Sequence, residues 1–366
     1  MKTLKSLPLW LLACLLAACS PQAAGPVIIP VSTPTGGPRP TPTASPFNSL
    51  PFVVPTPFPW ASLDVTGQLI FPRGRQGIAK LDLASGTLTD LFRPPERTWT
   101  STAAMSPDGT QLVMTYAPPP PEDQPQLGFT GLYLLPADGA GTPQPLLEPT
   151  QPFETYFWCV WAPDGRHIYY VRAVPVDTGE GRGYKFVIER ITYPGGEPQV
   201  LVEHALWLAV SPDGAKISYV RIDPATSAND LYLANADGSD PVRLLAPGTF
   251  LAVDAPLFSP DGQSILFSAT GDIPAPALTW LDDLLGVQVA SAHSVPSDWW
   301  RVPVAGGQPV RLTELYTTGL SADFSPDDRH LAFLSAEGLF LMNPDGTVVL
   351  PILPYAGGFG TLDWIP

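Results

Sequence analysis

The tetrapeptide Ser-Pro-Asp-Gly recurs along this chain at intervals of about 50 residues, a period that favours a propeller or a solenoid. It stands at residues 106–109, 211–214 and 259–262, with the variants Ala-Pro-Asp-Gly at 162–165 and Ser-Pro-Asp-Asp at 325–328. Proline restricts φ, aspartate can accept a hydrogen bond from the backbone two residues on, and glycine takes positive φ. Each copy therefore predicts a tight reversal between two strands.

Each copy is followed by the same succession of strand patterns. After residues 211–214 come an alternating strand at 216–220, a second strand at 231–233, a turn at 236–238 and a third strand at 242–245. The turn between the last two strands occurs six times, at residues 84–86, 138–139, 195–196, 237–238, 306–307 and 345–346. Six such repeats predict an all-β fold, a six-bladed β-propeller with four-stranded blades.

The first turn of the repeat occurs only five times, and its sixth copy is split between two distant parts of the chain. Residues 362–366 (Leu-Asp-Trp-Ile-Pro) match the run into the proline of the other turns, and residues 64–71 match the strand that comes after a turn. We therefore expect the C-terminal strand to complete the first blade, which closes the ring and leaves no long unpaired sheet edge.

Two of these phrases carry a specific resemblance. Residues 211–219 and 230–238 are similar to the WD-like repeats of the TolB-type six-bladed propellers, and the likeness spans residues 61–366. It implies the propeller fold and a protein-interaction role in the periplasm, although such repeats also occur beside hydrolase domains and in enzymes. One departure is Asp328, where the repeat has glycine. Because aspartate tolerates left-handed backbone, we expect a penalty of roughly 1 kcal/mol and an intact hairpin.

The N-terminus has the pattern of a signal peptide. Lys2 and Lys5 precede an apolar stretch at residues 7–18, which is too short for a permanent membrane span. Leu-Ala-Ala-Cys at 16–19 resembles the bacterial lipobox, so residues 1–18 are expected to be removed and Cys19 to carry the lipid. Cleavage before Cys14 would leave a stub of the apolar run, and a simple secretory signal is the other alternative. The lipid predicts a cell-envelope protein, anchored outside the cytoplasmic membrane or in the outer membrane if the cell has one.

Residues 19–60 have the composition of a tether. Twelve prolines fall between residues 20 and 60, with Thr and Ser between them and Arg39 as the only charge. Such a segment cannot bury a core and samples extended polyproline conformations. We expect it to hold the propeller away from the membrane.

Charge and cysteine content narrow the class of partner. The net charge is −15 and no basic stripe is present, so we expect no nucleic-acid binding and contact with the membrane through the lipid alone. Once Cys19 is acylated and Cys14 removed, Cys159 is the remaining thiol. It lies in an apolar run at 157–161 that predicts an inner strand, so we expect a buried structural cysteine.

The chain shows few signs of catalysis. His167 and His330 occupy matching places after a turn, His204 and His293 stand alone, and neither His-x-x-x-His nor Gly-x-Ser-x-Gly occurs. The repeated aspartates at 108, 164, 213, 261 and 327 fall one per blade, which favours a structural role in the turns. We therefore expect a protein that is not an enzyme, with no cofactor and no metal.

Two groups of residues are candidates for binding. The segments that lead into the inner strands carry aromatic and acidic side chains, which at a channel mouth would suit a sugar, a cationic peptide or a partner loop. These candidates are Glu154, Tyr156, Trp158, Trp207, Asp254 and Asp323. The alternative is that the tryptophans pack between blades.

The second group lies in an insertion, because the repeat that follows Asp261 is longer than the one before it. Apolar residues at helical spacing predict a short amphipathic helix at about 272–298. Its partner-docking candidates are Leu278, Leu281, Leu285, Trp299 and Trp300. The alternative is that this helix folds onto its own blade.

These observations predict a non-catalytic cell-envelope lipoprotein whose propeller binds a protein or glycan partner. The alternative is a propeller enzyme of the lyase or lactonase kind, with a divalent cation in the central channel. That alternative requires three or more His, Asp, Glu or Asn side chains that converge at the channel mouth.

Overall fold

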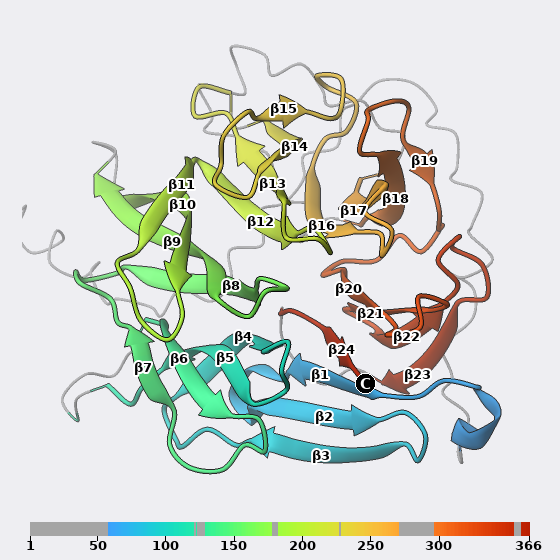
Figure 1. Ribbon diagram of the computed structural model, residues 1–366, viewed down its shortest axis with the longest axis horizontal. Helices are drawn as coiled ribbons and strands as arrows, with labels where there is room; N and C mark the ends of the chain where they lie inside the picture. The colour runs from blue at the N-terminus through green and yellow to red at the C-terminus, as the bar shows by residue number, and fades with distance from the viewer. Residues whose placement is uncertain are drawn as a thin grey trace, which may run out of the picture. The chain divides into compact units, whose positions relative to one another are not determined.

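The computed structural model describes residues 58–120, 122, 129–177, 182–226, 228–270, 296–354 and 360–366, all within one compact unit, Ala44–Pro366. These residues form six antiparallel four-stranded sheets arranged around a common centre (Figure 1). The predicted six-bladed propeller is confirmed. No helix of the described residues is long and apolar enough to cross a membrane.

The blades follow one another along the chain. Blade 1 consists of β24 (Asp363–Ile365), β1 (Gln68–Pro72), β2 (Ile78–Asp82) and β3 (Thr87–Phe92), and 3-10 turns lie at Trp60–Ser62 and Gly74–Gln76. Blade 2 is β4 (Trp99–Met105), β5 (Gln111–Ala117), β6 (Gly131–Pro136) and β7 (Gln144–Leu147), and blade 3 is β8 (Thr155–Trp161), β9 (His167–Asp177), β10 (Arg182–Thr192) and β11 (Gln199–Glu203). Blade 4 is β12 (Ala205–Val210), β13 (Lys216–Ile222), β14 (Asn229–Asn235) and β15 (Val242–Arg243), and blade 5 is β16 (Val253–Phe258), β17 (Ser264–Ala269), β18 (Asp298–Pro303) and β19 (Val310–Arg311). Blade 6 is β20 (Ser321–Phe324), β21 (Leu331–Ser335), β22 (Gly338–Met342) and β23 (Leu350–Pro354).

The C-terminal strand closes the ring. Strand β24 pairs antiparallel with β1, with Leu69 opposite Trp364, and the indole Nε1 of Trp364 donates to the carbonyl of Thr66 at 3.0 Å. The innermost strands β24, β4, β8, β12, β16 and β20 contact one another in that order around the centre. The prediction that the last strand completes the first blade is therefore confirmed.

The repeated turn is held by its own side chains. The serine hydroxyl donates to the aspartate Oδ1 and accepts from the backbone N–H five residues on, as Ser211 does with Asp213 at 2.6 Å and with Lys216 at 2.8 Å. The fourth residue has positive φ, 69° at Gly214 and 62° at Asp328. Because Asp328 adopts the left-handed conformation, its turn keeps the shape of the glycine turns, as expected from the sequence.

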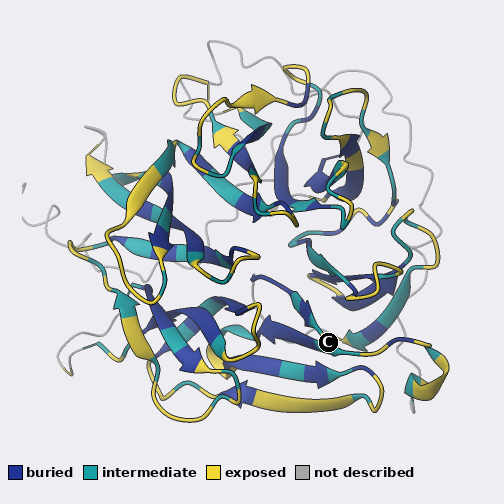
Figure 2. Cartoon of the chain, in the orientation of Figure 1, coloured by how far each residue is buried: buried dark blue, intermediate teal, exposed yellow. Residues whose placement is uncertain are grey.

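The core lies between blades, since each sheet buries both faces against its neighbours (Figure 2). One apolar cluster, for example, joins Ile70 and Ile78 of blade 1 to Leu112, Met114 and other side chains of blade 2. Cys159 is buried in a similar cluster between blades 2 and 3, and burial raises the pKa of its thiol to about 12. The expected structural role of Cys159 agrees with this position.

Candidate functional site

The central channel is a cavity of about 230 Å3 lined by residues of all six inner strands. Most of its wall is apolar, with alanine, valine, leucine and proline residues together with Met105, Trp158 and Trp161. The polar side chains of the described lining are Ser321, Asp323, Thr361 and Asp363. No Lys, Arg or His side chain is among the described residues of this wall.

The repeat explains why two carboxyl groups face the channel. In every blade the residue three positions before the turn proline, or before Pro366 at the chain end, lines the cavity: Ala104, Val160, Ala209, Leu257, Asp323 and Asp363. Four of these are apolar, and the two aspartates belong to blades 6 and 1, which are adjacent in the ring. Equivalent positions on adjacent inner strands place the two carboxyl groups side by side.

Both carboxyl groups also accept hydrogen bonds from the next inner strand. Oδ2 of Asp323 accepts from the backbone N–H of Trp364 at 2.7 Å, and Oδ2 of Asp363 accepts from the N–H of Met105 at 2.6 Å. The hydroxyl of Thr361 donates to the carbonyl of Ala103 at 2.7 Å and accepts from its N–H at 3.0 Å. The channel wall and the ring closure therefore share the same side chains.

The electrostatic environment of this pair favours the protonated form. Burial in the channel wall raises the pKa of Asp323 and of Asp363, and the charge of Asp363 raises the pKa of Asp323 further. Two carboxyl groups this close cannot both ionise without repulsion in a medium of low dielectric. The pair can therefore take up a proton, or it can bind a cationic group that enters the channel.

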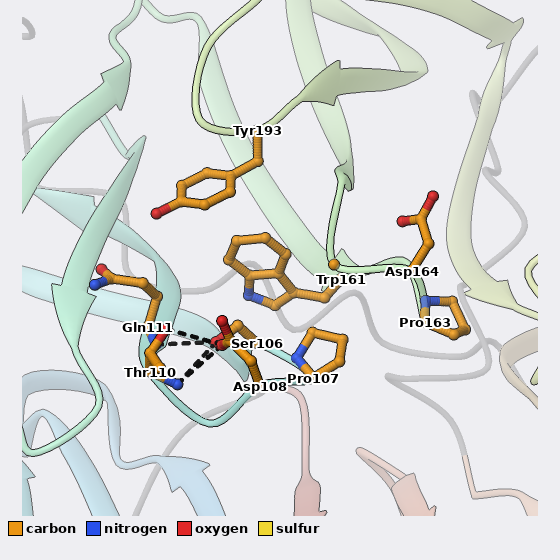
Figure 3. A pocket seen from close by; sticks show the side chains of 10 residues that line it. Ser106, Pro107, Asp108, Thr110, Gln111, Trp161, Pro163, Asp164 and Tyr193 are labelled. Atoms are coloured by element: carbon orange, nitrogen blue, oxygen red, sulfur yellow. Dashed lines mark hydrogen bonds between the residues drawn. The ribbon is translucent and has the colours of Figure 1, made fainter.

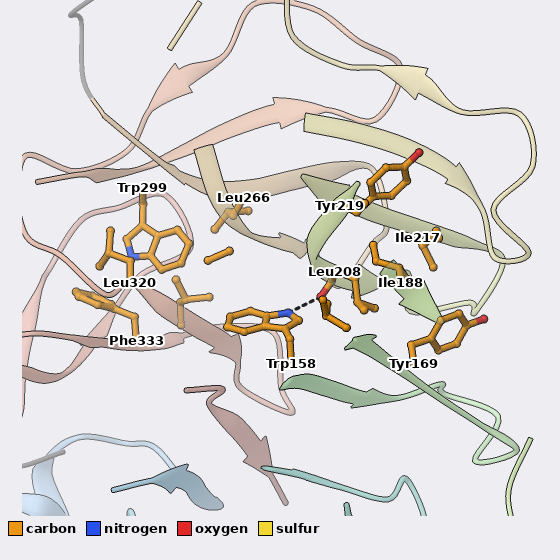
Figure 4. Packing of buried hydrophobic residues seen from close by; sticks show 14 of the residues in the cluster. Trp158, Tyr169, Ile188, Leu208, Ile217, Tyr219, Leu266, Trp299, Leu320 and Phe333 are labelled. Atoms are coloured by element: carbon orange, nitrogen blue, oxygen red, sulfur yellow. Dashed lines mark hydrogen bonds between the residues drawn. The ribbon is translucent and has the colours of Figure 1, made fainter. Parts of the chain in front are cut away.

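Trp158, like Trp161, is an aromatic residue of the channel wall. It lies at a β-bulge of β8 with φ of 54°, and its Nε1 donates to the carbonyl of Leu208 at 2.7 Å (Figure 4). Trp207 occupies the same bulge position in β12 with φ of 57°, and the two rings pack edge to face with centroids 4.6 Å apart. Trp158 thus reaches the channel, whereas Trp207 supports it from the next blade, which agrees with the alternative of packing between blades.

Glu154 and Tyr156 do not line the channel, which corrects their assignment as ligand-binding candidates. Glu154 is fully buried beside Arg172, with 2.7 Å between Oε1 and Nε, and Tyr156 donates to the same carboxylate at 3.1 Å. Arg172 also contacts Glu189 at 2.9 Å, and Glu189 accepts from Tyr170 at 3.0 Å. These contacts form a network of charged and phenolic groups within blade 3.

Asp254, Trp299 and Trp300 are likewise buried within the fold. Asp254 is fully buried in β16, opposite Ser268 of β17, and the channel wall does not include it. Trp299 and Trp300 are 0% and 7% exposed in β18, so neither presents a docking surface. Trp299 packs against Phe333 of the next blade (Figure 4). Leu278, Leu281 and Leu285 lie outside the described residues, and the helix that carries them stays a prediction.

Of the residues predicted at the channel mouth, Trp158 and Asp323 line the described cavity, and sequence reasoning missed Asp363 and Thr361, which also line it. The signal for Asp363 was present, because it stands three residues before Pro366 as Asp323 stands before Pro326. In the described residues no group of three or more His, Cys, Asp or Glu side chains is arranged to hold a metal ion.

No protein-family model matches the chain, and no curated protein matches its sequence. Among solved structures, a putative TolB from Agrobacterium tumefaciens is similar, with 19% identity, 82% of this chain and 99% of that chain covered, and a TM-score of 0.54. TolB from Acinetobacter baumannii shares 15% identity over 82% of this chain and 67% of its own, with a TM-score of 0.55. A chain of a nidogen–laminin complex shares 12% identity over 82% and 98%, with a TM-score of 0.56. At these identities the likeness shows the propeller fold.

Proposed function

We propose that this chain is a non-catalytic, lipid-anchored protein of the cell envelope, and that its propeller binds a partner protein at the central channel. The observation that carries the proposal is the channel wall, an apolar cavity of about 230 Å3 with a carboxyl pair and no cationic side chain among its described residues. Such a cavity suits one lysine or arginine side chain at the tip of a partner loop. The aliphatic stem would contact Trp158 and the aliphatic wall, and the charged end would meet Asp323 and Asp363.

The propeller fold supports a binding role. Similar folds occur in TolB proteins and in a structure of nidogen with laminin, a complex of two proteins. The inner strands supply short, rigid segments around one axis, so a loop that enters the channel meets a preformed wall and loses little affinity to reorganisation. The lipid at Cys19 and the proline-rich segment 19–60 would present this wall outside the membrane.

The second candidate is an enzyme with a divalent cation in the channel, and the carboxyl pair is the observation that favours it. Asp323 and Asp363 could supply two ligands, and oxygen-binding cations in proteins usually take more. A cation held there would stabilise the folded protein by mass action. Melting curves with added Ca2+ or Mn2+ separate the binding protein from the cation-dependent enzyme. A melting temperature that rises with the cation in the parent but not in Asp323→Asn would support the cation site.

The binding proposal is tested by capture from detergent-solubilised membranes. The bait is the full lipidated chain, compared with the double variant Asp323→Asn/Asp363→Asn and with Glu197→Gln, a control on an exposed loop. We expect one protein that the parent and Glu197→Gln retain and that the double variant loses. The same protein retained by all three baits would contradict a role for the carboxyl pair.

A further inference from the structure

A pocket of about 350 Å3 lies between blades 2 and 3, beside their Ser-Pro-Asp-Gly and Ala-Pro-Asp-Gly turns (Figure 3). We call it the blade 2–3 pocket. From blade 2, the turn and the start of β5 line the pocket, with Asp108 and Gln111. From blade 3, the turn and its flanking residues line it, with Trp161, Asp164 and Tyr193. Trp161 and Tyr193 stand between Gln111 on one side and Asp164 on the other (Figure 3).

Tyr193 departs from the repeat at this place. It follows the third strand of its blade, and its backbone N–H donates to the carbonyl of Arg166 at 2.7 Å. The residues that make the same bond in other blades are aliphatic: Leu83, Ala137, Ala236 and Val304. Packing of the propeller therefore does not require an aromatic side chain here.

The two rings form a fixed aromatic wall. Trp161 is 8% exposed, and its Nε1 donates to the carbonyl of Ala104 at 3.2 Å, which holds the indole in place. Tyr193 is half-buried and packs edge to face on this indole, with centroids 5.0 Å apart and planes at 78°.

A second pocket, between blades 5 and 6, lies at the equivalent place and lacks the second aromatic ring. It measures about 280 Å3 and has Phe324 in the place of Trp161, but Arg301 lines it and no second aromatic ring does. Pockets beside the turns are thus a feature of the repeat. The paired rings distinguish the blade 2–3 pocket.

The polar groups of the blade 2–3 pocket include a carboxylate that its turn holds in place. Oδ1 of Asp108 is held by the turn, accepting from Thr110 N–H at 3.0 Å, and Oδ2 has no hydrogen-bond partner among the described residues. The hydrogen bond from Ser106 lowers the pKa of Asp108, so this oxygen is an ionised acceptor at neutral pH. The amide of Gln111 and the hydroxyl of Tyr193 add donors as well as acceptors.

We propose that the blade 2–3 pocket binds a single neutral pyranose ring of a glycan. A pyranose combines an apolar C–H face with a rim of hydroxyl groups, and this pocket combines two aromatic rings with carboxylate, amide and phenol groups. Its volume is at the lower end of ligand pockets, which span roughly 300–1,000 Å3, so it fits one ring. The carboxylates of Asp108 and Asp164 would repel an acidic sugar, which selects a neutral one.

The test is saturation-transfer NMR with glucose, galactose, mannose and N-acetylglucosamine as probes. The protein is the full lipidated chain in a detergent without a sugar head group, because a glucoside would compete. We expect saturation transfer to at least one sugar at millimolar concentration, strongest at its C–H protons. Tyr193→Ala should weaken binding by roughly fivefold to tenfold through loss of the ring contact.

Matched variants separate a local effect from a folding defect. Alanine occurs at this position in blades 2 and 4, so Tyr193→Ala should stay folded and lose only the stability of its contact with Trp161, and Tyr193→Phe should keep the melting temperature of the parent and most of the affinity. Arg301→Ala, in the pocket between blades 5 and 6, should leave sugar binding unchanged. The proposal is overturned if none of the four sugars binds, if Tyr193→Ala binds as the parent does, or if an oligoproline peptide occupies the pocket in their place.

Discussion

The side chains of Asp323 and Asp363 both line the channel and connect neighbouring inner strands. Each carboxyl group faces the channel, and each accepts a backbone N–H from the next inner strand across a blade boundary. Aspartate in an unfolded chain has a pKa of about 3.9, and burial raises the pKa of both groups in the folded protein. Between the unfolded and folded pKa values the folded state holds protons that the unfolded state has released, so the contribution of this pair to the free energy of unfolding falls as the pH rises from about 4 through the folded pKa values.

Asp363→Asn should remove part of this pH dependence. The asparagine oxygen can still accept from the N–H of Met105, but the side chain cannot ionise. At about pH 8 we expect the variant to be more stable than the parent by on the order of 1–2 kcal/mol, with the difference vanishing near pH 4. Urea unfolding at a series of pH values measures it.

Asp108→Asn is the control for this experiment, because its pKa shift has the opposite sign. The hydrogen bond from Ser106 lowers the pKa of Asp108, so its contribution is present above the unfolded pKa and is lost as the pH falls. This variant should differ from the parent most at neutral pH and approach it in acid. Parallel stability curves for the parent and Asp363→Asn would show that the channel pair does not titrate as inferred.

At the scale of elements, the β-bulges of the inner strands decide which site residues could be predicted. Strands β8 and β16 shift register between Phe157 and Val160 and between Asp254 and Leu257. Residues after the bulge keep a constant count to the turn proline, so Val160 and Leu257 line the channel as the repeat predicts. For residues before the bulge this count no longer predicts the orientation, because the extra residue of the bulge reverses which face of the strand each side chain lies on.

Three of the predicted residues, Glu154, Tyr156 and Asp254, lie before the bulges. The number of residues between them and the turn proline therefore could not predict where their side chains point. The prediction that Trp299 and Trp300 form a docking surface was wrong for a different reason. It rested on their position next to a segment with helical periodicity. The two residues lie instead in a middle strand of blade 5, which neighbouring blades cover on both faces, so both side chains are buried. The blade count and ring closure were predictable because they follow from local turn chemistry and from one split repeat.

Strand β24 is short, and its removal should cost more than its length suggests. Deletion of residues 359–366 removes the buried side chains of Leu362 and Trp364, exposes the edge of β1 and leaves the N–H of Met105 without Asp363. We expect a loss of several kcal/mol and a clearly lower melting temperature. Calorimetry of the truncated and full chains measures the loss.

A point variant distinguishes the strand from its largest side chain. Trp364→Ala should cost about 3–5 kcal/mol, since the indole is 5% exposed and bonds Thr66. The truncation should be more damaging than this single change. Equal melting temperatures for the truncated and full chains would mean that the ring does not depend on this closure.

At the scale of the whole chain, the propeller and the N-terminal residues carry different features. The propeller carries the channel and the blade 2–3 pocket, whereas residues 1–60 carry the signal and tether patterns. The strongly acidic net charge of −15 gives the protein little attraction to anionic lipid head groups. Attachment to a membrane would therefore depend on the lipid that the sequence predicts at Cys19.

Cys19→Ala tests this dependence. Without the thiol no acyl chain can be attached, and several acyl chains hold a protein at a bilayer far better than residual surface contacts do. We expect the variant to leave washed membranes, to lack the added mass of the lipid, and to melt at the temperature of the parent because the propeller is unchanged. Cys14→Ala is the matched control and should stay anchored, since Cys14 lies inside the segment that the lipobox interpretation expects to be removed. A Cys19→Ala protein that remained on the membrane with the mass of the parent would disprove the lipobox interpretation, and release by Cys14→Ala instead would move the anchor to Cys14.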